Sequence, residues 1–269
     1  MLLSLTRDRS VLFSLDSLWG IRFIDALMNT ELLLYCLIVF AAALLGGMVT
    51  LVRRWSEYWL HLFLSFGAGI FLATVFTHLL PQAMEQGEAE TVGLFVLIGY
   101  LLIFFVERFL FYRRSENGDH VHPVVSTTAF IGLSVHSVIA GMGLAVFMPS
   151  PEVAMALLIS ILAHKTPAAF SLASLMILAK HSRRRIVISM VVFAAMTPLG
   201  ALVLAPALNT GSERLMVVLT SMVTGTFLYV ATADLLPEVF HSRHNRWLHL
   251  LLLLLGILIM GTIGLEHHH

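Results

Sequence analysis

The chain has 269 residues, of which 58% are hydrophobic and 12% are charged, and its mean hydropathy is +0.90. A soluble domain carries about 25% charged residues, so the composition excludes a soluble enzyme, a disordered chain and a nucleic-acid binder. The 16 basic and 16 acidic residues balance, and the single cysteine, Cys36, excludes a disulfide framework. The composition therefore predicts an all-α polytopic membrane protein.

The two ends of the chain differ from its centre. Residues 1–30 carry six charged side chains around a short apolar run, which indicates an N-terminal interfacial segment and not a signal peptide. Residues 265–269 read Leu-Glu-His-His-His and are interpreted as the remnant of an expression tag. Residues 31–264 are expected to form a single transmembrane domain.

Eight apolar runs approach the length of about 20 residues that a helix needs to cross a bilayer core. Short polar connections separate them, and the connection 82–91 contains three glutamates and no basic residue. The runs predict eight transmembrane helices: Leu32–Val52, Trp59–Leu80, Val92–Tyr112, Val125–Met148, Val153–Ala179, Ile186–Leu208, Leu215–Phe240 and Trp247–Ile263.

The distribution of lysine and arginine predicts an orientation. Eleven of these residues, counting Arg108 near the end of the third run, belong to the connections after the first, third, fifth and seventh runs, whereas the other three connections hold only Arg214. Cytoplasmic connections carry an excess of basic residues. The pattern therefore places the odd-numbered connections in the cytoplasm and both termini outside, in a plasma (inner) membrane.

Two segments of the chain repeat each other without gaps. Gly69–Gln82 in the second run and Gly225–Glu238 in the seventh share six of fourteen residues, including Leu-Leu-Pro, and the alignment equates His78 with Asp234. The two runs are expected to cross the membrane in opposite directions. Inverted repeats of this kind are typical of secondary transporters, whose site lies between the halves, so the runs are predicted to form an inverted 3+2+3 repeat.

Two histidines lie at matching depth in neighbouring runs. His136 is twelfth of 24 residues in the fourth run, and His164 is twelfth of 27 in the fifth. A buried ionisable group costs at least about 2.5 kcal/mol in a membrane and usually has a function. Because neutral imidazole binds zinc, iron, nickel and copper, the pair is interpreted as two metal ligands, with uptake falling as the pH drops through about 6. The alternative is a pair of core histidines bonded to backbone carbonyls.

Other polar residues in the runs extend this hypothesis. His78 and Asp234 lie beside Leu-Leu-Pro near opposite membrane faces and are interpreted as ligands at an entrance and an exit, or alternatively as caps of helix ends. Thr197 precedes Pro198 and offers a hydroxyl group. Lys165 lies deep in the fifth run and is expected to need a carboxylate partner, for which Asp234 and Glu107 are the candidates.

Six segments, taken in order, resemble the ZIP (Zrt/Irt-like) family of divalent metal transporters. The resemblance implies eight helices with both termini outside, metal import into the cytoplasm and a mid-membrane site between helices 4 and 5, with contributions from helices 2, 6 and 7. It also implies that helices 1, 4, 5 and 6 slide against helices 2, 3, 7 and 8. The segments are Gly69–Pro81, Gly99–Glu107, His136–Gly141, His164–Phe170, Met196–Gly200 and Gly225–Glu238.

Carried over to this sequence, the family pattern assigns ligand positions to particular residues. His136 and His164 match metal ligands, Ser137 matches a position that often holds Asn or Asp, and Thr197 and Asp234 match positions that are carboxylates in some members.

Three residues depart from the family pattern. Ala140 and Ala168 stand where acids are usual, and Lys165 stands where members with two metal ions place an acid. Because a fixed ammonium repels a dication, the sequence predicts one metal site and not two.

The sequence thus predicts a passive divalent-cation transporter that moves Zn²⁺, with Fe²⁺, Mn²⁺ or Cd²⁺ as further candidates, by an alternating-access, elevator-like mechanism. No enzyme activity and no nucleic-acid partner are expected; the partners are metal ions and bilayer lipid, and a homodimer is left open. One alternative is a b-type haem protein with His136 and His164 as axial ligands. Others are a ZIP-fold protein that has lost transport and an intramembrane zinc hydrolase, for which no acid beside either histidine supplies a general base.

Overall fold

The computed structural model describes residues 29–53, 55–111, 121–208, 213–241 and 245–266. Within these ranges all regular elements are helical, which confirms the predicted all-α class. Of the predicted interfacial segment 1–30 only residues 29–30 are described, and of the predicted tag 265–269 only residues 265–266, which end helix α12. The elements are α2 (Thr30–Val52), α3 (Glu57–Thr74), η1 (Val75–Leu79), α4 (Leu80–Gln86), α5 (Ala89–Phe105), η2 (Val106–Phe111), α6 (Val121–Phe147), α7 (Pro151–Leu178), α8 (Arg183–Leu199), η4 (Gly200–Leu204), α9 (Ala205–Leu208), α10 (Glu213–Tyr229), η5 (Val230–Leu235), α11 (Leu236–His241) and α12 (Arg246–Glu266).

These helices are long and apolar enough for a polytopic membrane protein. Among the described residues, seven continuous helices reach the length and hydropathy of a membrane span, and α12 adds a shorter apolar stretch, Arg246–Thr262. Local signals set several of the boundaries. The side chain of Asn29 accepts a hydrogen bond from the backbone N–H of Leu32 at 3.0 Å and caps α2, and Pro151 begins α7, where its missing N–H costs nothing.

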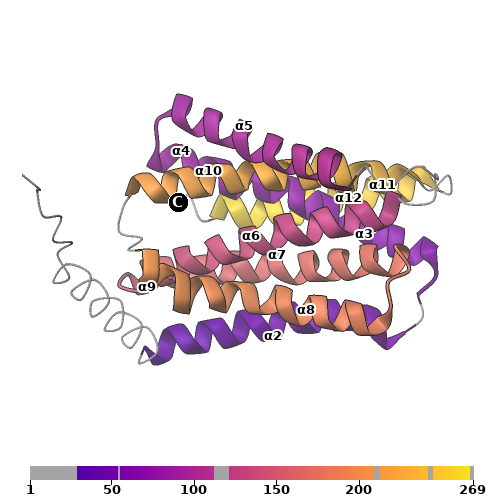
Figure 1. The fold of residues 1–269 in the computed structure, drawn as a ribbon, viewed down its shortest axis with the longest axis horizontal. Coiled ribbons are helices and arrows are strands. Elements are labelled where there is room, and N and C mark those ends of the chain that lie inside the picture. The colour runs from indigo at the N-terminus through magenta and orange to yellow at the C-terminus, as the bar shows by residue number, and fades with distance from the viewer. Residues whose placement is uncertain (1–28, 54, 112–120, 209–212, 242–244, 267–269) are drawn as a thin grey trace, which may run out of the picture.

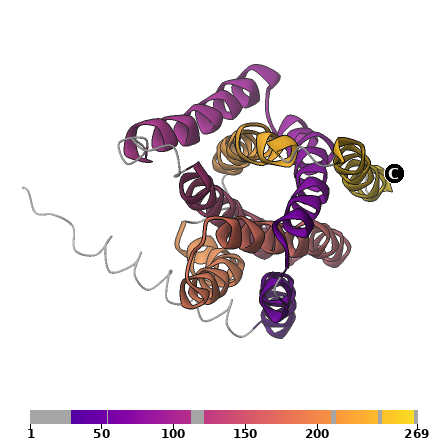
Figure 2. The same cartoon turned by 90° about the vertical axis from the view of Figure 1, so that its right-hand side faces the viewer.

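The helices form two groups, visible as the lower and upper halves of Figure 1. The first group contains α2, α6, α7 and α8, in which α2 and α6 each pack against α7 and α8. The second group contains α3, α5, α10 and α12, in which α3 packs against α12 and α5 against α10. The groups meet where α3 lies along α7 and α10 lies along α6, and Figure 2 shows the same division from one end of the bundle.

Pairs of glycines hold helices together inside each group. A Cβ atom added to either glycine of a pair would collide with a backbone oxygen of the facing helix, so the two backbones touch directly. Between the groups, in contrast, Gly67 faces the Ser171 side chain and Gly132 faces the Val230 side chain. The reciprocal pairs are Gly69 with Gly256 between α3 and α12, Gly99 with Gly225 between α5 and α10, and Gly141 with Gly200 between α6 and the end of α8.

Three helices contain a π-helical segment just before a proline. In each, the residue after the π segment donates its N–H to the carbonyl five residues earlier, as Leu80 does to Val75. Proline lacks an N–H and collides with the carbonyl four residues before it, and the wider π turn accommodates both defects without ending the helix. The pairs are η1 with Pro81, η4 with Pro206 and η5 with Pro237.

One predicted helix boundary was therefore wrong. The second span was expected to end at Leu80, but one continuous helix runs from Glu57 to Gln86. The π turn of η1 absorbs Pro81, and the polar residues that follow it still form helix α4.

The internal repeat found in the sequence has a matching local structure. The alignment places η1 opposite residues 231–235, which belong to η5, so both copies carry their π turn at the same position. The helices run in opposite directions, because Gly87 at the end of α4 contacts Val217 near the start of α10. We refer to the end of the bundle that contains residues 87–88 and 148–150 as the Glu85 end, and to the opposite end, with residues 179–182, as the Arg183 end.

Candidate metal site

A cavity of about 410 Å³ lies between the two helix groups. The α6 and α7 helices line it from one group, and α3, η1, α4 and α10 line it from the other. Its inner end is formed by buried residues such as Thr74 and His164, whereas Glu85 and Gln86 at its other end are exposed. The cavity therefore leads from the bundle interior to the Glu85 end. Its polar lining residues are Thr74, His78, Gln82, Glu85, Gln86, His136, Ser160, His164 and Thr220.

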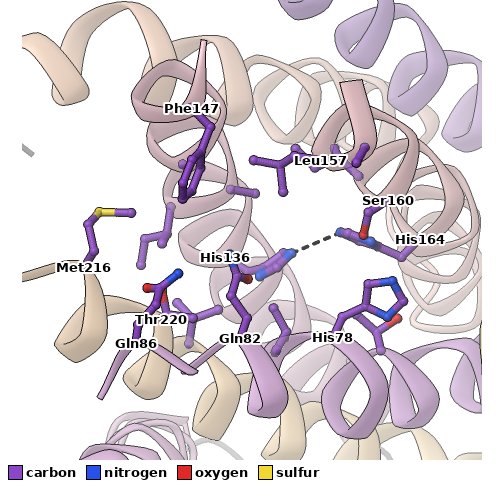
Figure 3. A pocket seen from close by; sticks show the side chains of 18 of the residues that line it. His78, Gln82, Gln86, His136, Phe147, Leu157, Ser160, His164, Met216 and Thr220 are labelled. Carbon is purple, nitrogen blue, oxygen red and sulfur yellow. Dashed lines mark hydrogen bonds between the residues drawn. The ribbon is translucent and has the colours of Figure 1, made fainter. Parts of the chain in front are cut away.

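His136 and His164 face each other at the inner end of this cavity (Figure 3). They are 5% and 7% exposed, and their Nε2 atoms are 3.3 Å apart. α6 and α7 are antiparallel neighbours joined by the short turn at residues 148–150, so residues near their midpoints lie at the same level. The predicted convergence of the two rings is thus observed.

The distance between the two Nε2 atoms suits a shared metal ion. Zinc–nitrogen bonds are about 2.0–2.1 Å and zinc is usually tetrahedral, so two nitrogens on one ion lie about 3.3–3.4 Å apart. The observed 3.3 Å matches that edge. Without an ion, the same distance allows one Nε2–H to donate a hydrogen bond to the other Nε2, which keeps both rings oriented.

His78 lies beside this pair and comes from the other helix group. It lines the cavity from η1, and Figure 3 shows its ring turned toward Ser160 and His164. The hydroxyl of Thr77 lies 2.9 Å from His78 Nδ1 and helps to orient the ring. His78 was expected near the end of its span, but eight more helical residues follow it, so it lies deep in the bundle.

The three histidines do not form a closed cluster. Among the residues that the structure describes, no three His, Cys, Asp or Glu side chains come close enough together to hold a metal ion. The arrangement is a converged pair on α6 and α7, with a third imidazole approaching from η1.

Asp234 lies in a different polar network, outside the cavity lining. It is 2% exposed on η5, and Thr128 of α6 donates a hydrogen bond to its Oδ2 at 3.2 Å. Nearby, the Tyr229 hydroxyl donates to the carboxylate of Glu107 on η2. Both carboxyl groups therefore lie on π-helical segments, nearer the Arg183 end than the histidines are.

Ser137 and Thr197 are buried but point away from the cavity lining. Ser137 donates to the carbonyl of Leu133 in its own helix at 2.7 Å. Thr197 accepts a hydrogen bond from Lys165 Nζ at 2.7 Å. These contacts bring neither hydroxyl group into the lining of the cavity that holds the histidine pair.

The prediction that Lys165 pairs with a carboxylate was wrong. Its ammonium contacts the Thr197 hydroxyl and lies 4.4 Å from the centre of the Phe193 ring. Successive helical residues point about 100° apart, so Lys165 faces α8 while His164 faces α6. Asp234 on η5 and Glu107 on η2 belong to the other helix group.

Ser160 and Thr220 line the cavity, but the sequence analysis did not predict them as site residues. Ser160 lies one helical turn before His164, on the same face of α7, and is 8% exposed. Helical spacing from His164 could have indicated it. Thr220 had no such signal, because it depends on how α10 packs against α6.

The fold and this site define a polytopic membrane protein with a cavity between two helix groups that histidines line. The sequence profile of the ZIP zinc transporter family matches residues 30–128 and 115–264, so the chain belongs to the ZIP family. It is 25% identical to zinc transporter ZIP9-B of Xenopus laevis, over 89% of this chain and 99% of that protein. It is 26% identical to human zinc transporter ZIP1, over 75% of this chain and 77% of the relative.

Proposed function

We propose that the chain carries Zn²⁺ passively across a membrane through a site built on His136 and His164. The 3.3 Å separation of their Nε2 atoms carries this proposal, because it fits two ligands of one tetrahedral zinc ion. The relatives described as zinc transporters support the choice of metal. Imidazole also binds Fe²⁺ and Cd²⁺, and Mn²⁺ is the weakest of the candidates because it prefers oxygen ligands.

In this proposal His78 becomes the third ligand when its ring moves closer to the histidine pair, and water completes the shell. Three protein ligands with one open position are typical of zinc that must exchange a ligand. Because His78 comes from α3–η1 and the pair comes from α6 and α7, a bound ion connects the two helix groups. Movement of one group then removes His78 from the ion and weakens binding, as release requires.

Asp234, Ser137 and Thr197 have other parts in this proposal. Asp234 is a ligand that the ion meets after it leaves the histidines, on the way to the Arg183 end. Thr197 holds Lys165, which keeps α7 and α8 together during transport. Ser137 orients the turn of α6 that carries His136 through its bond to Leu133.

The proposed transport step is a sliding of α2, α6, α7 and α8 against α3, α5, α10 and α12. The glycine pairs lie inside the groups. Between the groups, where α3 meets α7, Gly67 faces the side chain of Ser171 and not a backbone atom. Backbone contacts of this kind resist displacement more than side-chain contacts do. Each group can therefore move as a unit, with α6 and α7 carrying the histidine pair.

The charge pattern assigns the direction of the proposed transport. The Glu85 end carries the connections with few basic residues, so it is placed outside, together with both termini, in the plasma membrane. The cavity is then an entrance for ions from outside, and Zn²⁺ enters the cytoplasm at the Arg183 end. We propose no enzyme activity, and a homodimer stays a prediction that light scattering of the purified protein can test.

The haem alternative fits the geometry poorly. Axial ligands bind haem iron from opposite faces of the macrocycle, and two nitrogens bound in trans at about 2 Å would lie about 4 Å apart. The Nε2 atoms are closer than that and within hydrogen-bond distance of each other. A macrocycle between them would require the helices to separate.

Zinc uptake into proteoliposomes tests the proposed function. The His136→Ala/His164→Ala variant should bind no zinc at this site and should show uptake at the level of empty liposomes. The control is His181→Ala, because His181 lies in the α7–α8 connection, where it contacts Ser126. Undiminished transport by the double variant would refute the ligand assignment, and zinc binding without transport by the unmodified chain would indicate a protein that has lost transport.

A further inference from the structure

An apolar layer closes the inner end of the cavity. The innermost lining residues on α3, α6, α7 and α10 are Thr74, His136, His164 and Val223. One turn closer to the Arg183 end, the same four helices present Phe71, Leu133, Ala168 and Phe227. These four side chains are 1–3% exposed and belong to one hydrophobic cluster. The layer separates the histidine pair from the Arg183 end.

The two phenylalanines of this layer occupy equivalent positions in the internal repeat. Phe71 is the third residue of Gly69–Gln82, and Phe227 is the third residue of Gly225–Glu238. Their ring centroids are 5.0 Å apart. Equivalent residues of two inverted copies can touch only near the axis that relates the copies, and in such repeats that axis lies in the plane of the membrane. The phenylalanine pair therefore lies at the centre of the bundle.

The pair also contacts the candidate ligands. The Phe227 ring centroid is 4.1 Å from that of His136. The two phenylalanines belong to α3 and α10, whereas Leu133 and Ala168 belong to α6 and α7, which carry the histidines. The layer is thus divided along the same boundary as the two helix groups.

We infer that Phe71 and Phe227 form a fixed aromatic barrier, which the histidine pair must pass for an ion to reach the Arg183 end. This inference rests on the proposed sliding of the groups. The barrier stays with α3 and α10, while Leu133 and Ala168 move away from it with α6 and α7. An ion then crosses only when bound to the histidines, because the remaining path is closed by two apolar rings that offer no ligand.

A thiol placed on the side of the barrier that faces the Glu85 end tests this inference without relying on transport. Thr220 lines the cavity on α10, in the same helix group as the phenylalanines. In a Cys36→Ser background, Thr220→Cys is the single thiol of the chain. We expect a membrane-impermeant methanethiosulfonate to modify it from the Glu85 end and not from the Arg183 end. Modification at similar rates from both ends would overturn the fixed barrier.

Removal of the two rings should open the second route. With Phe71→Ala/Phe227→Ala added, we expect modification of Thr220→Cys from the Arg183 end to become at least about tenfold faster. The matched control is Phe76→Ala, because Phe76 is on the same continuous helix but is 54% exposed on the outside of the bundle. An unchanged rate in the double variant, or an equal increase in the control, would contradict the inference.

A milder variant covers the case in which the alanine protein does not fold. Phe71→Leu/Phe227→Leu keeps apolar bulk at both positions, and should raise the modification rate from the Arg183 end by about threefold. No increase in a protein that elutes as one species would contradict the barrier. Zinc flux separates this inference from the proposed function: the alanine pair should leak zinc even when His136 and His164 are also alanine, whereas the thiol result stands whether or not zinc is the substrate.

Discussion

The two copies of the internal repeat share a π-helical turn and differ in the polar side chain that this turn carries. Each copy places a π turn before Leu-Pro, and each carries one polar residue at the same aligned position, His78 in one and Asp234 in the other. His78 lines the cavity that leads to the Glu85 end. Asp234 is buried with Thr128, closer to the Arg183 end.

The difference indicates how an inverted repeat can build an asymmetric path. The same local geometry supplies an uncharged nitrogen on one side of the histidine pair and a carboxylate on the other. A neutral ligand next to the capture site leaves the ion's charge uncompensated, whereas a carboxylate beyond it attracts the ion onward. The two positions should therefore affect different steps of transport, and the following variants examine that expectation.

Loss of His78 should have the largest effect. His78→Ala removes a proposed ligand of the capture site, so we expect the KM for zinc uptake to rise about tenfold or more, which corresponds to at least about 1.4 kcal/mol of binding. Gln82→Ala is the matched control, because Gln82 lines the same cavity one turn further along. An unchanged KM in proteoliposome uptake would exclude His78 from the capture site.

Replacement of Asp234 should affect the maximal rate and leave the KM unchanged. Asp234→Asn keeps the size of the side chain and the acceptor for Thr128, but it replaces the carboxyl group by an amide, which is a weaker metal ligand. We expect the maximal rate of uptake to fall about fivefold to tenfold, because only the step after capture loses a ligand. A rise in KM as large as that of His78→Ala would place Asp234 in the capture site instead.

Replacement of the proline in each copy of the repeat should have a smaller effect on zinc uptake, and the two replacements should change different kinetic constants. Pro81→Ala restores an N–H and favours a regular helix over the π turn, which would turn His78 away from its present direction. We expect a KM about threefold higher for Pro81→Ala and a maximal rate about threefold lower for Pro237→Ala. The opposite assignment of the two effects would contradict the division of roles between the copies.

The smallest expected effect concerns the hydrogen bond between the groups. Thr128→Val removes the donor to Asp234 while it preserves shape, and a typical hydrogen bond makes a net contribution of about 0.5–1.5 kcal/mol. Because Thr128 is on α6 and Asp234 is on η5, the bond must break when the groups slide. We expect a change in the maximal rate of about twofold, and a tenfold loss would assign Thr128 a larger part than this account does.

The sequence predicted the histidine pair because its position depends on helix length alone. Antiparallel helices joined by a short turn bring residues near their midpoints to the same level, as His136 and His164 show. The depth of His78 was not predicted, because hydropathy and Pro81 suggested a helix end where a π turn continues the helix. The partner of Lys165 was not predicted either, since one residue of helix changes the direction of a side chain by about 100° and the neighbour it meets depends on packing.

The most direct test of the account is anomalous scattering from crystals soaked in zinc. We expect a peak about 2.0–2.1 Å from the Nε2 atoms of both His136 and His164, and the loss of this peak in crystals of the double alanine variant. A zinc peak bound elsewhere in a protein that transports zinc, with neither histidine within bonding distance, would contradict the account.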